Sequence, residues 1–592
     1  MMAKITVRQL HFFNALRCGS FVQTLIPGMK RNASVPILLA VCLGCLLHPL
    51  SLSAQKINYM GLADSCMKLK DYTCAAENYD LALEKLDPES NGIAFMAARA
   101  WALTNDKEKT WTALKRYVKN NGLNNNIFFS NELLKEKSFD FLKDDARWKA
   151  MIAAAEDGEN RERAREKKSL DSVKAASKAV ESALDVRPQL KNLSNTPYTK
   201  LKTLLVYRSP KPYVKDNGVT LYIRVDATDV PFYVQLPAGY DPAKPSPVLV
   251  VLHGAVQYNV GYGDASTSRY VYRATSDHIP FYSKNYITIY PMGTKTINWM
   301  TTESGFDMVN RIVVYLKAFL NIDDNRVELL GHSNGATGVF TYLVKSPTLY
   351  AGFYGMDTQP RVYIGGTFLQ NAMTRHFYNF ATDKDYHYPY AAVKTIDSLA
   401  KSLGVTWYTQ LNVGYPHWFP AMKEAFTPMA KIFADMAHRV RNPYPDSIYF
   451  ETDNVKYGAS DWITVTQLDT LSKKAAWQTD PNFKITAWPD KNDFNKIVHR
   501  EEMAFYYPHK SAAVKAKRQG NNFYVQTSDV AAFCIRLNRE MIDYSKKVNV
   551  FVNGKKVFSQ RIKPDKAFTL SNFKKNLDRK VIWEHEINIP VQ

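Results

Sequence analysis

The chain has 592 residues, of which 46% are hydrophobic and 13% aromatic, and its formal net charge is +21. This composition is that of a globular protein and excludes a disordered chain, while the length is too great for one hydrophobic core, so we expect three or four domains. The positive charge can draw a protein toward acidic polymers or membrane surfaces. No nucleic-acid motif accompanies it, and we interpret it as a solvated basic surface.

Residues 1–54 have the pattern of a targeting segment. A basic stretch around Lys30 precedes an apolar run from Val35 to Leu47 that is too short to span a bilayer, and small residues lead up to Ala54. We therefore expect a secreted or periplasmic protein that is cleaved near Ala54 and keeps no stable membrane span afterwards. A lipoprotein signal that ends at Cys45 is the alternative.

Residues 55–155 are expected to form a helical domain. Its apolar pattern recurs about 35 residues along the chain, a tetratricopeptide-like period in which small residues let paired helices approach closely. Such units bind protein partners or act as spacers. The equivalent pairs are Ala63 and Ala98, Asp71 and Asp106, and Tyr79 and Leu114.

A charged helical linker is predicted over residues 156–199. Acidic and basic side chains alternate between Glu156 and Ser172 without an apolar stripe, which is typical of a helix surrounded by solvent.

Cysteine usage is consistent with export. After residue 54 only Cys66, Cys74 and Cys534 remain, and their scatter makes no metal site. Cys66 and Cys74 flank an expected helix–helix turn and could form a disulfide in an oxidising compartment. Two small buried side chains are the alternative.

Residues 200–444 alternate short apolar strands with helices, which predicts a mostly parallel sheet with helices on its faces. Residues 248–252, 286–290 and 327–330 are examples of the strands, and residues 307–320 and 391–402 of the helices.

From residue 445 onward only strands are expected, and we predict a β-sandwich over residues 445–592. Asn553-Gly554 lies between two apolar runs and indicates a two-residue hairpin.

The central motif of the predicted sheet domain is Gly331-His332-Ser333-Asn334-Gly335. A strand precedes it and a helix follows it, which is the context of a nucleophile elbow. The tight turn needs small residues around Ser333, whose side chain is then held above the end of the sheet. Ser333 is the candidate nucleophile.

A serine hydroxyl needs a base, and the base needs an orienting acid. In such a fold the acid and then the histidine follow the serine along the chain. His417 comes directly after the last predicted strand of the parallel sheet and is the candidate base. Asp385, four residues before the helix-opening Pro389, is the preferred acid; Asp383 and Asp357 are alternatives.

An oxyanion intermediate needs N–H donors at fixed positions. We expect one from the backbone of Asn334 and another from the loop after Gly254, at Ala255 or Val256. His253 is expected to hold that loop in place. His332 is expected to be a packing residue. No cofactor or metal ion is implied.

The motifs to be compared with known families are His253-Gly254, Tyr290 to Gly293, Asn321-Ile322-Asp323, Gly331 to Gly335, Asp385 and His417. Together they resemble secreted α/β-hydrolases over roughly residues 220–442. The closest group is the polyhydroxyalkanoate depolymerase/feruloyl esterase-like group, with the prolyl oligopeptidase-like group as neighbour. The resemblance implies a multidomain α/β protein: an α/β-hydrolase core between the helical-repeat domain and the β-sandwich. One departure is Gly335-Ala336, where many of these enzymes have two glycines.

The sequence therefore predicts a secreted serine esterase that acts on an acyl or aryl ester, either a small molecule or linked to a polysaccharide. A serine peptidase of the prolyl oligopeptidase-like type would use the same three residues. A non-catalytic envelope scaffold, which binds partners through its repeats, is the alternative outside enzymes.

Overall fold

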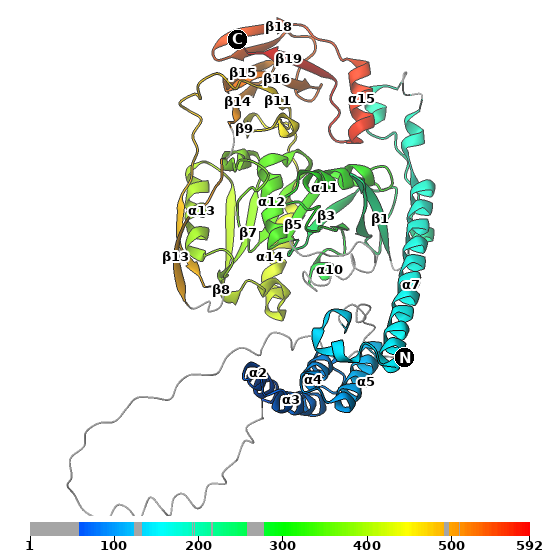
Figure 1. The fold of residues 1–592 in the computed structure, drawn as a ribbon. Coiled ribbons are helices and arrows are strands. Elements are labelled where there is room, and N and C mark those ends of the chain that lie inside the picture. The colour runs from blue at the N-terminus through cyan, green and yellow to red at the C-terminus, as the bar shows by residue number, and fades with distance from the viewer. Residues whose placement is uncertain are drawn as a thin grey trace, which may run out of the picture. The chain divides into compact units, whose positions relative to one another are not determined.

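The computed structural model describes residues 58–591 with gaps at 124–132, 192, 194–195, 215–216, 257–277, 491–495 and 508–509. The chain forms two compact units, Met1–Asp157 and Gly158–Gln592 (Figure 1). The predicted leader, with Ala54 and Cys45, lies outside the described residues. Within the described ranges, no helix combines the length and the apolar character that crossing a membrane requires.

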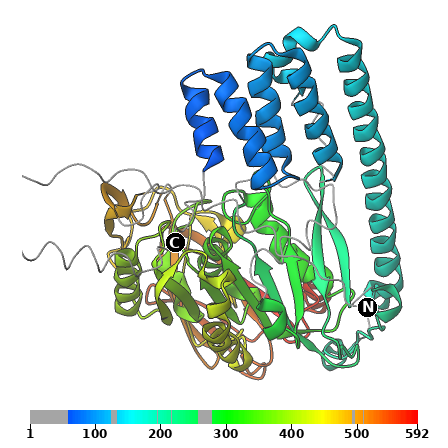
Figure 2. The ribbon, with the colours of Figure 1, turned by 90° about the horizontal axis from the view of Figure 1, so that it is seen from below.

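Four helices of the first unit pair in sequence order, and Figure 2 shows them side by side. Equivalent positions of the repeating pattern have equivalent surroundings. Ala63 and Ala98 are fully buried. The carboxylates of Asp71 and Asp106 accept hydrogen bonds from backbone N–H groups at the start of α3 and α5, both at 3.0 Å. The elements are α2 (Tyr59–Lys68), α3 (Tyr72–Lys85), α4 (Asn91–Leu103), α5 (Lys107–Leu123) and the 3-10 helix η1 (Lys137–Leu142).

Cys66 in α2 and Cys74 in α3 form a disulfide, which is the first of the two alternatives that the sequence left open. Cys534 is a buried free thiol in the second unit.

Helix α7 (Ala146–Leu184) contains much of the predicted linker. Its charged part is largely exposed, as at Arg165 and Lys168. Near its end, however, Val180 and Leu184 are buried in the main hydrophobic core of the second unit. This end of the predicted linker is therefore part of that core and not surrounded by solvent.

The second unit contains an eight-stranded sheet with the order β1-β2-β4-β3-β5-β6-β7-β8. β3 to β8 pair in parallel, and β1 and β2 add an antiparallel hairpin at the β4 edge. β1 was not anticipated from sequence. The strands are β1 (Gly218–Val225), β2 (Thr228–Gln235), β3 (Ser246–Leu252), β4 (Ile287–Pro291), β5 (Ile322–His332), β6 (Gly352–Met356), β7 (Phe377–Lys384) and β8 (Trp407–Pro416).

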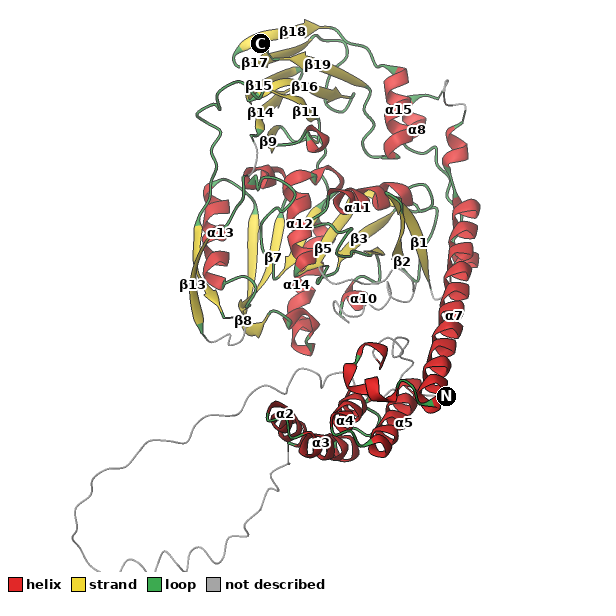
Figure 3. Ribbon diagram, in the orientation of Figure 1, coloured by secondary structure: helices red, strands yellow, loops and turns green. Residues whose placement is uncertain are grey.

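Helices cover both faces of this sheet (Figure 3). Alternate strand residues point to opposite faces. In β3, Val248 and Val250 therefore pack in the core that contains α11 and α12, whereas Leu249 and Val251 pack in the core that contains α14. The helices are α10 (Ile279–Tyr282), α11 (Glu303–Leu316), α12 (Asn334–Lys345), α13 (Tyr390–Ser402) and α14 (Phe426–His438).

After α14 the chain forms a four-stranded sheet, β10-β11-β16-β19, and a five-stranded sheet, β18-β17-β15-β14-β9. Both contribute to one hydrophobic cluster. A separate hairpin of β12 and β13 packs instead against the core of the eight-stranded sheet. The strands are β9 (Ser447–Thr452), β10 (Ala459–Ser460), β11 (Ile463–Leu468), β12 (Lys484–Pro489), β13 (Ile497–Met503), β14 (Ala512–Gln519), β15 (Asn522–Ser528), β16 (Val530–Leu537), β17 (Val548–Val552), β18 (Lys555–Gln560) and β19 (His585–Pro590).

The expectation of strands alone after residue 445 is wrong at α15 (Lys566–Asn576). The side chain of Asp565 accepts a hydrogen bond from Phe568 N at 2.9 Å and caps this helix. The predicted hairpin is present, because Asn553 and Gly554 both adopt positive φ, 48° and 85°, between β17 and β18.

Buried ion pairs join the eight-stranded sheet and its helices to the C-terminal strands. Lys345 Nζ lies 3.1 Å from Asp453, and both side chains are almost completely buried. Arg375 Nη2 lies 2.5 Å from Asp461 Oδ1. Arg441 lies 2.9 Å from Asp578. All three cations precede β9 in the chain, with Arg441 in the segment just after α14, and all three carboxylates follow β9.

Candidate active site

Ser333 lies at the sharp turn between β5 and α12, and its backbone has φ 56° and ψ −122°. A left-handed φ is costly for a residue with a side chain and persists only where the surroundings impose it. Here the glycines impose it by bringing backbone segments together. A Cβ on Gly335 would lie 2.0 Å from the oxygen of Leu252, and one on Gly331 would lie 2.4 Å from the carbonyl carbon of Gly335. The turn therefore requires glycine at both positions.

His417 and Asp385 lie next to each other at the same end of the sheet. Asp385 follows β7 and His417 follows β8, and both side chains are buried. His417 Nδ1 is 3.0 Å from Asp385 Oδ2. The two atoms are close, but they are not aligned as in a straight hydrogen bond, and neither ring nitrogen has an aligned partner among the described residues. The other oxygen, Oδ1 of Asp385, accepts from His387 N at 2.7 Å.

Asp383, the nearest sequence alternative, has a different contact. Its Oδ1 accepts a hydrogen bond from Gly414 N at 2.6 Å and so joins β7 to β8. The structure places Asp385, and not Asp383, beside the imidazole of His417.

Asp357, the other alternative, follows β6 and is buried. Its Oδ1 accepts from both the N–H and the hydroxyl of Thr382, at 2.9 and 2.8 Å. Its Oδ2 has no hydrogen-bond partner among the described residues and lies 3.9 Å from His332 Nε2. Burial, together with the nearby charge of Asp385, holds the pKa of Asp357 well above its usual range.

His332 does more than fill space. Its Nε2 lies 2.9 Å from the carbonyl oxygen of His417. A carbonyl oxygen only accepts, so this nitrogen carries the ring proton. Burial lowers the pKa of His332 to about 3, which keeps the ring neutral. The residue before Ser333 thus fixes the backbone of His417. The sequence did not indicate this role, because the middle positions of the motif specify no partner.

The loop after β3 passes against Ser333. A Cβ on Gly254 would lie 3.1 Å from Ser333 Cβ, and the exposed Ala255 has φ 54°. Asn334 is the first residue of α12, so its N–H has no partner within the helix. The expected oxyanion donors, the N–H groups of Asn334 and Ala255, therefore belong to segments that meet at Ser333. The side chain of Val256, the alternative to Ala255, is fully buried.

His253 holds this loop, as its position in the sequence suggested. Its Nε2 accepts from Gly293 N at 2.9 Å, so the proton is on Nδ1, which lies 2.7 Å from the oxygen of Gly254. The ring meets Trp299 edge-on at 4.8 Å. Burial lowers the pKa of His253 to about 4.

No protein-family model matches this chain, and no curated protein sequence matches it. Solved structures resemble part of it. A thermostable esterase has 17% identity and a TM-score of 0.32, over 38% of this chain and 64% of that one. Esterase 2 of Thermogutta terrifontis, phosphorylated by paraoxon, has 12% identity and a TM-score of 0.30, over 38% and 95%. S-formylglutathione hydrolase from Staphylococcus aureus has 11% identity and a TM-score of 0.29, over 37% and 98%.

The mixed sheet, the helices on both faces and the turn at Ser333 fit an α/β-hydrolase core. We call the segment from β1 to α14 the hydrolase core.

One group of side chains in the hydrolase core has the spacing of metal ligands. One donor atom from each of His332, Asp357 and His417 lies within 4.8 Å of the other two. Nε2 of His332 is occupied by its hydrogen bond to the His417 carbonyl, and Nδ1 of His417 faces Asp385. We therefore interpret the group as buried polar side chains packed together, in which His332 holds the backbone of His417.

Trp418 is 55% exposed beside these buried residues. Its ring meets that of His417 edge-on, with the centroids 5.4 Å apart. The exposed ring presents an apolar surface next to His417.

Proposed function

We propose that this protein is an exported carboxylic-ester hydrolase in which Ser333 is the nucleophile, His417 the general base and Asp385 the residue that orients His417. The observation that carries the proposal is the 3.0 Å approach of His417 Nδ1 to Asp385 Oδ2 at the sheet end where Ser333 is held in a strained turn. Such a combination of nucleophile, base and orienting acid is the general requirement for serine catalysis.

In the proposed reaction, Ser333 Oγ forms a bond to the ester carbonyl carbon while His417 Nε2 takes the hydroxyl proton. The electron pair of the carbonyl moves to its oxygen, which accepts hydrogen bonds from the N–H groups of Asn334 and Ala255. When the intermediate collapses, the bond to the alcohol breaks and the alcohol takes the proton from His417. Water then repeats the sequence on the acyl-enzyme, which releases the acid and restores Ser333.

The proposed substrate is an acyl or aryl ester, free or on an extracellular polysaccharide, as in the polyhydroxyalkanoate depolymerase/feruloyl esterase-like group. The exposed ring of Trp418 beside His417 supports an apolar or aromatic group next to the ester.

We also propose roles for the remaining parts. The paired helices α2 to α5 are a short tetratricopeptide-like unit that binds a protein partner, which the shared burial of Ala63 and Ala98 supports. The five- and four-stranded sheets form a β-sandwich, which their common hydrophobic cluster supports. Export through the leader before Gln55 is supported by the Cys66–Cys74 disulfide.

The test is covalent labelling of the full mature chain with a fluorophosphonate, followed by peptide mass spectrometry. We expect the adduct on Ser333 and no adduct in Ser333→Ala. Hydrolysis of p-nitrophenyl acetate, compared with that of p-nitroacetanilide, then separates ester from amide cleavage. A chain that takes no label and cleaves neither compound would be the non-catalytic scaffold.

A further inference from the structure

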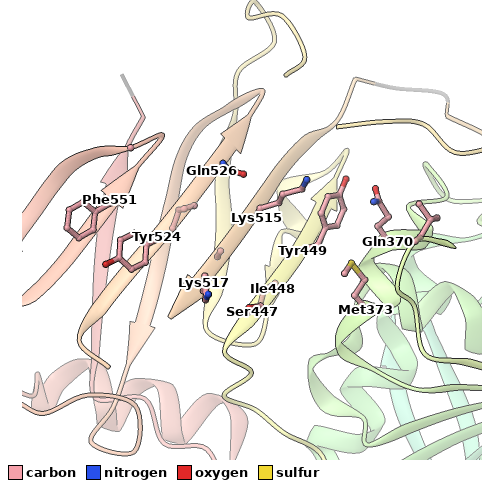
Figure 4. A pocket seen from close by; sticks show the side chains of 14 residues that line it. Gln370, Met373, Ser447, Ile448, Tyr449, Lys515, Lys517, Tyr524, Gln526 and Phe551 are labelled. Carbon is pink, nitrogen blue, oxygen red and sulfur yellow. The ribbon is translucent and has the colours of Figure 1, made fainter. Parts of the chain in front are cut away.

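A cavity of about 650 Å³ lies on the outer face of the five-stranded sheet, away from Ser333 (Figure 4). Side chains of β9, β14, β15 and β17 form its floor. Gln370 and Met373 of the 3-10 helix η6 (Leu369–Thr374), together with Leu403 at the end of α13, form its wall. Sheet and wall both belong to the second compact unit.

The floor of the cavity is an ordered row of side chains. Alternate residues of each strand point inward, as Phe523 and Val525 of β15 do in the shared hydrophobic cluster, and leave the others on the outer face. Direct cross-strand pairing aligns four outward residues over four neighbouring strands, roughly 15 Å from end to end at the usual strand spacing. The row is Phe551, Tyr524, Lys517 and Ser447, and the row beside it contains Gln526, Lys515 and Tyr449.

One end of the row is aromatic. The rings of Tyr524 and Phe551 stack with their centroids 4.9 Å apart and their planes 13° apart, and Tyr524 is 40% exposed. Stacked aromatic rings that remain exposed on a sheet can contact the apolar faces or edges of a ligand.

The charge of the cavity has one sign. Its lining contains Lys515 and Lys517 and no Asp or Glu. Neither lysine forms an ion pair with a carboxylate among the described residues, although Lys515 Nζ lies 4.6 Å from the ring centre of Trp477. The amides of Gln526 and Gln370 and the hydroxyls of Ser447, Tyr449 and Tyr524 complete the polar side-chain groups. The complementary ligand carries negative charge, hydroxyl groups and apolar surface.

We propose that this cavity binds a chain of acidic sugars. Sugar rings present C–H surface to Tyr524 and Phe551, their hydroxyls suit the amides and Ser447, and their carboxylates or sulfates suit Lys515 and Lys517. A phosphodiester chain is a poorer match, because it carries a charge on every nucleotide and is usually held by several Arg and Lys side chains.

The cavity is remote from the candidate active site. Asn371 of η6 donates from Nδ2 to the oxygen of Val344, near the C-terminal end of α12, and to the oxygen of Glu451 in β9, both at 2.7 Å. Ser333 is at the N-terminal end of the same helix, whose 12 residues span about 18 Å. A sugar chain in the cavity would therefore leave Ser333 free and anchor the enzyme on a polymer. The anchoring role rests on the proposed esterase function, but the binding does not.

The test is calorimetric binding of an oligogalacturonate to the full mature chain carrying Ser333→Ala, so that no turnover occurs. Adding Tyr524→Ala or Lys517→Gln should raise Kd about tenfold or more. Lys574→Gln, an exposed change on α15, should leave Kd unchanged. Added salt should weaken binding, because the lysines are partly exposed.

Four results would overturn the proposal: no binding, equal binding of a neutral malto-oligosaccharide of the same length, tighter binding of a single-stranded oligonucleotide, or variants that bind like the parent. Lys517→Gln keeps the proposal testable if Tyr524→Ala does not fold, because it changes only an exposed side chain. An inactive esterase that still binds oligogalacturonate would refute the proposed function and leave the sugar site standing.

Discussion

At the N-terminal end of α12, buried polar atoms lack partners, whereas at its C-terminal end buried cations face carboxylates. Near Ser333, Asp357 Oδ2 and both ring nitrogens of His417 have no aligned hydrogen bond to a described residue. At the other end, Lys345, the last residue of α12, pairs with Asp453 at 3.1 Å, and Arg375 pairs with Asp461 nearby. The two ends belong to one helix and one core.

Under the proposed function, the open groups near Ser333 serve the chemistry and the paired charges serve assembly. An unpaired buried polar atom destabilises the folded state, so most are paired. Of the atoms left open near Ser333, Nε2 of His417 is the one that exchanges a proton in the proposed reaction. The pairs at the far end fix the C-terminal strands on the hydrolase core.

The largest effect should come from the nucleophile. Ser333→Ala removes one hydroxyl and should lower kcat for p-nitrophenyl acetate by about 10⁶ without changing the fold. Ser402→Ala, which removes an exposed hydroxyl at the end of α13, should leave kcat unchanged. If Ser333→Ala kept an activity comparable to that of the parent, Ser333 would not be the nucleophile, and the open groups near it would have no catalytic role.

Asp385→Asn should lower kcat by roughly 10⁴, because an amide can favour the wrong tautomer of His417. Asp383→Asn is the matched control. Its amide oxygen can still accept from Gly414 N, so we expect nearly full activity. Both should be measured on variants whose circular dichroism matches the parent. The reverse ranking would assign the orienting role to Asp383.

At the paired end, Arg375→Met should lower the free energy of unfolding by about 3–5 kcal/mol, because it leaves Asp461 buried without its cation. Urea denaturation of the second unit measures this change. Lys401→Met, which breaks the exposed pair with Asp397, should shift the midpoint by no more than the experimental error. Equal effects of the two variants would mean that burial does not distinguish these pairs.

Acid should destabilise the loop next to Ser333 through His253. Its pKa is lowered to about 4 in the folded state, and the unfolded value is about 6.5. The unfolded chain therefore binds the extra proton first, and stability falls as pH decreases from about 6.5 to about 4, by about 3 kcal/mol in total. His253→Gln can still accept from Gly293 N and cannot titrate. Denaturation of parent and variant across this range should show a shallower decline in the variant.

The smallest effect should come from Asp357→Asn. The raised pKa of Asp357 favours its protonated form, which an asparagine resembles in size and in its contacts with Thr382. Asparagine also tolerates the φ of 52° at this position. We expect kcat/KM to stay within about threefold of the parent. A loss as severe as that of Asp385→Asn would move the orienting acid to Asp357.

Local sequence patterns were sufficient to predict much of the hydrolase core. The apolar run 248–252 lies in β3, and the strand, glycine-flanked serine and helix around Ser333 are each visible in a short window of sequence. The position of Asp385 relative to Pro389 selected the carboxylate that lies beside His417. These features depend on neighbours in the chain.

The features that sequence did not reveal depend on distant contacts. The hydrogen bond from His332 to the His417 carbonyl joins residues 85 positions apart. β14 was not anticipated from sequence. Its outer face carries Lys515 and Lys517, so the strand has fewer apolar residues than a core strand. α15 was also missed, but it does not depend on a distant contact. Asp565 is a local capping signal that precedes this helix in the sequence.

The order of the charged residues along the chain has a consequence for synthesis. Lys345, Arg375 and Arg441 are all made before their partners Asp453, Asp461 and Asp578. On the ribosome, the hydrolase core is therefore translated completely while three cations that will be buried still lack their carboxylates. A chain truncated at residue 444 would keep these cations without their carboxylates. The charges of these three buried cations are therefore balanced only after residues 453, 461 and 578 have been added.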